Sequence, residues 1–205
     1  METVAVNGTI RTEVGKKATK AVRKQGEVPC VIYGGDQVIH FTSAPSSFKH
    51  LIFTPEFKLA EITLDGTAYK CILKDAQYHP VTDEIVHMDF LQLVDGQSII
   101  VNIPLAFKGV SPGVKAGGKL VSKLRTIKIK TTPDQIVNQL FVDISEVTLG
   151  NSVRVRDVEV TDKMLVMNPG ATPVASVEIP RALKSAAAGE EAEGEQAGAE
   201  VAAAE

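Results

Sequence analysis

The sequence predicts a mostly β protein with a few short helices, organised as two β domains and a tail. Many short runs of β-branched and aromatic residues are separated by turn residues, whereas long helical patterns are few. A turn signal at Asp95-Gly96-Gln97 starts a fresh series of such runs, and after Leu183 the composition narrows towards Ala, Glu and Gly. We therefore expect β domains at residues 1–95 and 96–182, and a disordered acidic Ala/Glu tail at residues 183–205.

The first domain is expected to open with a strand at residues 4–10 and to continue into a basic helix. Its cations lie between two glycines with no acid among them: Lys16, Lys17, Lys20, Arg23 and Lys24. Spacings of three and four residues place most of these cations along one broad helical face. Gly26 suits a helix stop, and the next strand is expected over residues 28–33. A basic helix at the edge of a sheet is suited to gripping phosphates, and the alternative is a solvated charged helix.

Turn residues divide the rest of the first domain into strands and one short helix. Gly34-Gly35-Asp36 and Asp65-Gly66 are hairpin signals, and the second is the strongest in the chain. Pro45 and Ser46 suit the start of a short helix that extends to Phe53. The expected strands are residues 31–33, 38–41, 61–64, 67–73 with an extension over 75–79, and 85–94.

The second domain is predicted to be mostly antiparallel, because its helical content is too low for βαβ crossovers. A glycine-rich loop is expected at residues 109–118 and one helical turn at residues 133–139. The expected strands are residues 98–107, 120–124, 126–131, 140–144, 152–155, 164–167 and 174–179.

Charge is distributed unevenly along the chain. The formal net charge is −3, but the tail after Ser185 carries six glutamates and no base, so the remainder has a net charge of +3. A basic N-terminal end suggests a polyanionic partner. No apolar run is long enough for a membrane span and no secretory signal is visible, so we expect a cytoplasmic protein. Cys30 and Cys71 are expected to be buried thiols rather than a disulfide.

A polar surface is expected on the strand at residues 85–91. Alternation places Val86, Met88 and Phe90 on a core face, and it places His87 and Asp89 together on the opposite face. We expect three further residues to lie beside His87 and Asp89. Gln77 and His79 share a face of the preceding strand, and Tyr33 follows the basic helix. Amides, imidazoles, carboxylates and phenols read base edges and ribose hydroxyls, so these residues and the basic helix together predict an RNA site. Taken singly, each of these residues also fits a surface ion pair or a half-buried histidine.

Four motifs in the same order resemble a known family. Residues 15–34 and 77–90 resemble the bacterial ribosomal large-subunit protein twenty-five, the CTC family, which binds 5S rRNA. Residues 103–120 and 141–157 resemble the extra C-terminal domain of that family's long, two-domain form. The first pair reads G-K-K-x-x-K-x-V-R-K-x-G-x-V-P-x-V-I-Y-G and Q-Y-H-P-V-T-D-E-I-V-H-M-D-F.

This resemblance implies a small N-terminal β-barrel that sits on the loop E region of 5S rRNA, in a widened minor groove. It implies a structural protein of the large (50S) subunit that contacts other large-subunit components and needs no cofactor, metal or small-molecule substrate. Lys20 stands where many family members have arginine, which keeps the charge but loses the bidentate fork, and Cys30 replaces a small residue. The expected RNA-binding residues are Arg11, Lys16, Lys17, Lys20, Arg23, Lys24, Tyr33, Gln77, His79, His87 and Asp89.

Two other readings compete with RNA binding. In the first, His79, His87 and Asp89 are metal ligands or a general base in an enzyme, but the sequence shows no complete ligand set and no nucleophile motif. The glycine-rich loop also lacks the order of a phosphate-binding loop. In the second, the chain is a protein-interaction or stress module whose RNA contact is incidental.

Overall fold

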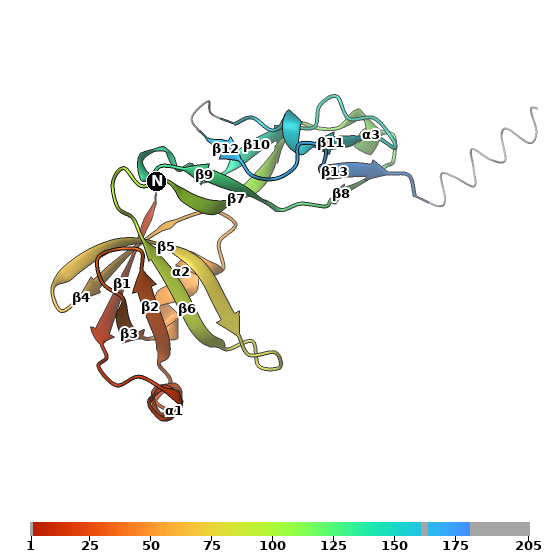
Figure 1. Cartoon of the computed structure of the whole chain (residues 1–205). Coiled ribbons are helices and arrows are strands. Elements are labelled where there is room, and N and C mark those ends of the chain that lie inside the picture. Colours follow the sequence, from red (N-terminus) through yellow and green to blue (C-terminus); the bar gives the residue numbers. More distant parts are fainter. Residues whose placement is uncertain (1, 161–163, 181–205) are drawn as a thin grey trace, which may run out of the picture. The chain divides into compact units, whose positions relative to one another are not determined.

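The computed structural model describes residues 2–160 and 164–180, and the expected tail at residues 183–205 lies outside them. The chain divides into two compact units (Figure 1). Residues up to Pro104 and Lys128–Gln139 belong to the first unit, and Leu105–Ile127 and Leu140–Val160 belong to the second. The expected domain boundary at residue 95 stays a prediction.

Six strands close into a barrel in the order β1-β3-β2-β6-β5-β4. This arrangement agrees with the expected barrel, and the class of a mostly β protein with short helices is confirmed. The strands are β1 (Thr3–Ile10), β2 (Val28–Tyr33), β3 (Ile39–Ser43), β4 (Leu59–Leu64), β5 (Thr67–Tyr78) and β6 (Ile85–Gln92).

Antiparallel hairpins account for most of the barrel. Strands β2 and β3 pair through the turn at Gly34-Gly35, where Gly34 has a φ of 94°, and β4 and β5 pair through Asp65-Gly66, where both residues have positive φ. Closure adds two parallel pairs that the hairpin signals did not predict, β1 with β4 and β2 with β6. These pairs join strands that are distant in sequence, and local turn chemistry carries no information about such pairs.

The basic helix α1 spans Lys16–Lys24 as predicted, and Gly26 after it has a φ of 79°. The short helix expected at residues 46–53 is a 3-10 turn, η1 (Pro45–Phe48), that runs into α2 (Lys49–Ile52). This segment delivers the fully buried Phe48 ring to the barrel interior, where its centroid lies 5.9 Å from that of Phe90. The centroid of the Phe41 ring also lies 5.9 Å from that of Phe90.

The second half of the described chain forms two smaller sheets with strand orders β10-β7-β9-β12 and β11-β13-β8. Antiparallel pairing, as predicted, joins β11 to β13, β13 to β8 and β12 to β9, whereas β10 runs parallel to β7. The glycine-rich segment is not entirely loop, because it contains the one-turn helix α3 (Pro112–Lys115). The helical turn expected after β9 is the 3-10 turn η2 (Pro133–Gln135). A further 3-10 turn, η3 (Val155–Asp157), follows later in the chain. The strands are β7 (Ile99–Lys108), β8 (Lys119–Ser122), β9 (Thr126–Thr131), β10 (Leu140–Asp143), β11 (Ser152–Arg154), β12 (Leu165–Val166) and β13 (Pro173–Glu178).

Both cysteines are buried free thiols, which confirms the expectation from sequence. Burial raises the pKa of both thiols, that of Cys71 to about 12. They therefore remain protonated and serve as small apolar residues of the barrel core. Among the described residues, no helix has the length and apolarity that a membrane crossing needs.

Candidate RNA-binding surface

The outer face of the barrel carries two rows of side chains that run across neighbouring strands. Alternation sends Cys30, Met88 and Phe90 into the core, so their sequence neighbours point outward. We call the two rows together the polar wall. The Asp89 row consists, in spatial order, of Arg11, His40, Val31, Asp89 and Asp75, and the His87 row consists of Thr9, Thr42, Pro29, His87 and Gln77.

Strand register defines these rows. In the Asp89 row, Val31 pairs with both His40 and Asp89, and Asp89 pairs with Asp75. Arg11 lies directly after β1 and its backbone N–H donates to the His40 carbonyl at 3.0 Å. In the His87 row, Thr42 pairs with Thr9 and Pro29, and Gln77 pairs with His87. His87 lies beside Pro29, one position before the Cys30–Met88 pair.

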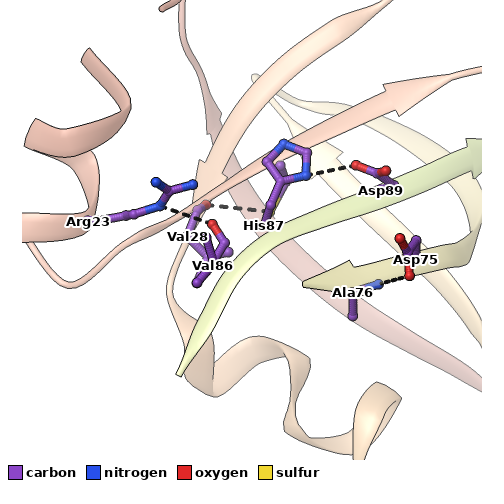
Figure 2. Close-up of polar contacts among 8 residues, drawn as sticks. Arg23, Val28, Asp75, Ala76, Val86, His87 and Asp89 are labelled. Atoms are coloured by element: carbon purple, nitrogen blue, oxygen red, sulfur yellow. Dashed lines mark hydrogen bonds and ion pairs between the residues drawn. The ribbon is translucent and has the colours of Figure 1, made fainter. Parts of the chain in front are cut away.

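His87 and Asp89 lie side by side on β6, as the alternation predicted (Figure 2). His87 Nδ1 is 2.8 Å from Asp89 Oδ1, and both side chains are about a quarter exposed, at 23% and 27%. Asp89 Oδ1 nevertheless receives no directed hydrogen bond, so the contact is an ion-pair distance and leaves that oxygen with free acceptor capacity. Asp75 stands opposite Asp89 on β5, so two carboxylates share this part of the wall.

Tyr33 lies on the same outer face of β2, two residues beyond Val31, and is half-buried. Partial burial raises the pKa of its phenol, and the nearby carboxylates of Asp89 and Asp75 raise it further. The phenol is therefore neutral at physiological pH and able to donate a hydrogen bond. The β2–β6 register, which pairs Val31 with Asp89 and Tyr33 with Leu91, places Tyr33 two residues along β2 from the Asp89 row.

Helix α1 is attached beside the polar wall by two arginine contacts. Arg23 Nε donates to the Val86 carbonyl at 3.1 Å, immediately before His87 on β6 (Figure 2). Arg11 Nη1 donates to Thr19 Oγ1 at a long 3.5 Å, and Thr19 in turn donates to the Gly15 carbonyl at 2.8 Å. The structure thus brings Arg11, Arg23, His87 and Asp89 together on one side of the barrel.

The four lysines of α1, Lys16, Lys17, Lys20 and Lys24, are exposed, and no residue of the helix is fully buried. Basic residues in the last turn also complement the negative end of the helix dipole. The helix therefore presents most of its charge to solvent next to the polar wall.

His79 differs from its predicted position. Strand β5 ends at Tyr78, after a register shift that follows Gln77, so His79 lies outside the strand and does not continue the face that Gln77 occupies. Its Nδ1 accepts the backbone N–H groups of Val81 and Thr82, at 3.4 and 3.2 Å, within the turn that connects β5 to β6. His79 is exposed and can still present its other ring nitrogen, but half of its hydrogen-bonding capacity is used to shape this turn.

Sequence reasoning missed His40, Asp75 and the threonine pair of the polar wall. Thr9 Oγ1 and Thr42 Oγ1 lie 2.9 Å apart in a cross-strand hydrogen bond. His40 stands between Ile39 and Phe41, and its alternation with the buried Phe41 was the available signal that it points outward. Asp75 precedes Gln77 by two residues in the strand, which places both on one face.

No metal centre supports the enzyme reading within residues 2–160 and 164–180. In this part of the chain, no group of three or more His, Cys, Asp or Glu side chains is arranged to hold a metal ion. The His87–Asp89 pair lies on an open barrel wall rather than in a closed site.

Comparison with known proteins gives matches to both halves of the chain. The model of the ribosomal L25p family matches residues 6–90, and that of the C-terminal domain of ribosomal protein TL5 matches residues 98–181. A large ribosomal subunit protein bL25 of Porphyromonas gingivalis is 39% identical over 189 residues, which cover 91% of this chain and 98% of the relative. The bL25 proteins of Cytophaga hutchinsonii and Bacteroides fragilis are 39% and 36% identical; the alignments cover 90% and 92% of this chain and 95% and 98% of those relatives.

Proposed function

Because the chain belongs to the ribosomal L25p family and is a protein of the large ribosomal subunit, we propose that it binds 5S rRNA at loop E through helix α1 and the polar wall. Membership of this family makes it a ribosomal protein and not an enzyme. The second half belongs with the C-terminal domain of TL5, which gives the two-domain form. Residues 1–95 form the RNA-binding domain in this proposal, and residues 96–182 contact other components of the subunit.

The observation that carries this proposal is the hydrogen bond between Arg23 Nε and the Val86 carbonyl. It fixes the last turn of a helix with five cations beside the strand that presents His87 and Asp89. Phosphate contacts position a protein on RNA, whereas contacts to base edges and 2′-hydroxyls discriminate among RNAs. This side of the barrel has groups for both tasks within one surface.

The proposed roles follow from side-chain chemistry. Lys16, Lys17, Lys20 and Lys24 act as point charges for phosphates, and Arg11 and Arg23 add directed N–H groups. Tyr33 donates from a neutral phenol, while His87, Asp89 and Gln77 offer donors and acceptors to base edges and ribose. His79 is included through the ring nitrogen that the β5–β6 turn leaves available.

A gel-shift titration of the full chain tests the proposal. The purified protein is titrated with 5S rRNA and with the same RNA in which the non-Watson–Crick pairs of loop E are replaced by Watson–Crick pairs. We expect tight binding to the first RNA and binding to the second at the level of an unrelated duplex. Equal affinity for the two RNAs would reject loop E as the target, and no binding to either would reject 5S rRNA as the partner.

A further inference from the structure

Two neighbouring residues of the Asp89 row each have a buried polar atom without a hydrogen-bond partner: Nε of Arg11 and Nδ1 of His40. Buried polar groups in folded proteins are nearly always paired, because an unpaired group loses its hydration without compensation. Two such atoms on adjacent residues of the outer face point to a polar partner, which reaches them when the Arg11 and His40 side chains turn outward.

Arg11 and His40 are direct neighbours in this row. The β1–β3 register pairs Thr9 with Thr42 and Ile10 with Phe41, so Arg11 falls opposite His40, and the 3.0 Å backbone hydrogen bond between them continues the ladder. Their side chains leave the sheet on the same face, which is also the face of Asp89. His40 thus extends the wall beyond β2, onto a strand that carries none of the RNA-binding residues expected from the sequence.

The two unpaired atoms are chemically complementary to a hydroxyl group. Arg11 Nε–H can only donate, and His40 Nδ1 accepts when the neutral ring carries its proton on Nε2. A phosphate oxygen satisfies the arginine but offers no proton to His40, and Asp89 and Asp75 in the same row disfavour an anion. A ribose 2′-hydroxyl accepts and donates at once, so one group of this kind has the chemistry that both atoms need.

We propose that His40, together with Arg11, binds a ribose 2′-hydroxyl of the RNA and so distinguishes RNA from DNA at that nucleotide. This inference rests on the proposed RNA-binding function. It names a residue, a strand and a chemical group that this function alone does not specify.

The test combines a protein substitution with an RNA substitution. His40→Leu removes the acceptor at similar volume, His40→Asn keeps an acceptor near the Nδ1 position, and His50→Leu is the matched control, because His50 is an exposed histidine of α2 outside the polar wall. Each full-length protein is titrated with 5S rRNA and with a series in which single loop E nucleotides are 2′-deoxy. Thermal unfolding of each variant shows that the barrel is intact.

We expect His40→Leu to weaken binding by about fivefold to tenfold, the usual effect of one hydrogen bond, while His40→Asn retains most of the affinity. One 2′-deoxy position should weaken the unsubstituted protein by a similar factor and leave the His40→Leu protein unaffected, so that the two losses are not additive. His50→Leu should bind as the unsubstituted protein does.

Two outcomes would overturn this inference while leaving the proposed function standing. In one, His40→Leu binds 5S rRNA as tightly as the unsubstituted protein. In the other, His40→Leu weakens binding, but its effect adds to that of every 2′-deoxy position, so that no hydroxyl is its partner. Failure of the unsubstituted protein to bind 5S rRNA would instead reject the proposed function, and this inference with it.

Discussion

Asp89 is a carboxylate on a surface that we propose for a polyanion, and this makes it the most informative single residue of the polar wall. It stands opposite Asp75, and like charges across a strand pair are unfavourable. Its Oδ1 lies 2.8 Å from His87 Nδ1 and still has acceptor capacity. A negative group in this position repels phosphates in general and accepts from a base amino group or a hydroxyl, so we expect it to contribute selectivity rather than affinity.

The substitution Asp89→Asn tests this role. The amide keeps the shape but removes the charge, so we expect cognate 5S rRNA binding to weaken by roughly 1.5–3 kcal/mol, the usual strength of a charged hydrogen bond. Binding to a generic RNA duplex should stay unchanged or become slightly tighter, because one repulsive charge is lost. Parallel gel shifts with the two RNAs measure both effects, and equal losses on both would show that Asp89 does not read the site.

Arg23 connects the helix to the wall, so its replacement should affect both phosphate binding and geometry. Arg23→Ala is expected to weaken 5S rRNA binding by about 1–3 kcal/mol. Arg23→Lys keeps the charge but loses the Nε donor to Val86, so its affinity for 5S rRNA should lie between those of the unsubstituted protein and Arg23→Ala. The control is Lys70→Ala, which removes an exposed cation of β5 opposite Glu61. If Lys70→Ala lowers the affinity for 5S rRNA as much as Arg23→Ala does, the effect comes from net charge alone.

At the scale of elements, α1 is the least anchored part of the RNA-binding surface. It has nine residues, none of them fully buried, and its lysines at positions 16, 20 and 24 follow one another at a spacing that brings like charges together. Isolated helices of this length are marginal in water, so the contacts that Arg11 and Arg23 make are important for holding α1 in place. RNA phosphates would relieve the repulsion between its lysines.

Hydrogen exchange tests this view of α1. In the free protein we expect the amides of Lys20 to Lys24 to exchange rapidly, and we expect them to become protected when 5S rRNA is bound. Amides of the central barrel strand β2 serve as the internal reference, since they should be protected in both states. Slow exchange of the α1 amides in the free protein would mean that the helix is preformed and that RNA does not stabilise it.

The phenylalanine cluster supports the barrel from inside. The centroid of the Phe90 ring lies 5.9 Å from those of Phe41 and Phe48, and all three side chains are fully buried. Phe90→Ala should lower the free energy of unfolding by about 3–5 kcal/mol through lost burial and a cavity. Phe53→Ala, at a residue that is 73% exposed, should change it little. Urea unfolding measures the free energy of unfolding of both variants. Similar decreases for Phe90→Ala and Phe53→Ala would argue against this cluster as the centre of the core.

At the scale of the whole molecule, salt dependence measures how many cations reach the RNA together. Each phosphate neutralised makes the slope of log affinity against log salt more negative by about 0.7 to 0.9, so four or five contacts from α1 and its neighbours predict a slope of about −3 to −4.5. Binding constants measured across a range of KCl concentrations give this slope. If affinity does not change with salt concentration, the basic helix does not supply the phosphate contacts, even if binding itself is tight.

The sequence predicted local features well and non-local ones poorly. Helix α1 was found between Gly15 and Gly26, as predicted, because glycines and charge spacing mark it, and the His87–Asp89 pair was found because alternation within one strand fixes it. The parallel pairing of β2 with β6 depends on closure of the barrel, which no short segment specifies. His40 was missed although its alternation with the buried Phe41 signalled that it points outward; only its place beside Arg11 depends on the non-local pairing of β1 with β3. His79 was misplaced because a register shift ended β5 one residue earlier.

The parallel pairing of β2 with β6 also has a consequence for synthesis. The two strands are separated by more than fifty residues, so a nascent chain displays α1 well before the strand that carries His87 and Asp89 has left the ribosome. Until then the emerging polypeptide has the lysines that attract any nucleic acid and lacks the groups that discriminate. In the proposed function, selectivity therefore requires β6 to dock and complete the barrel.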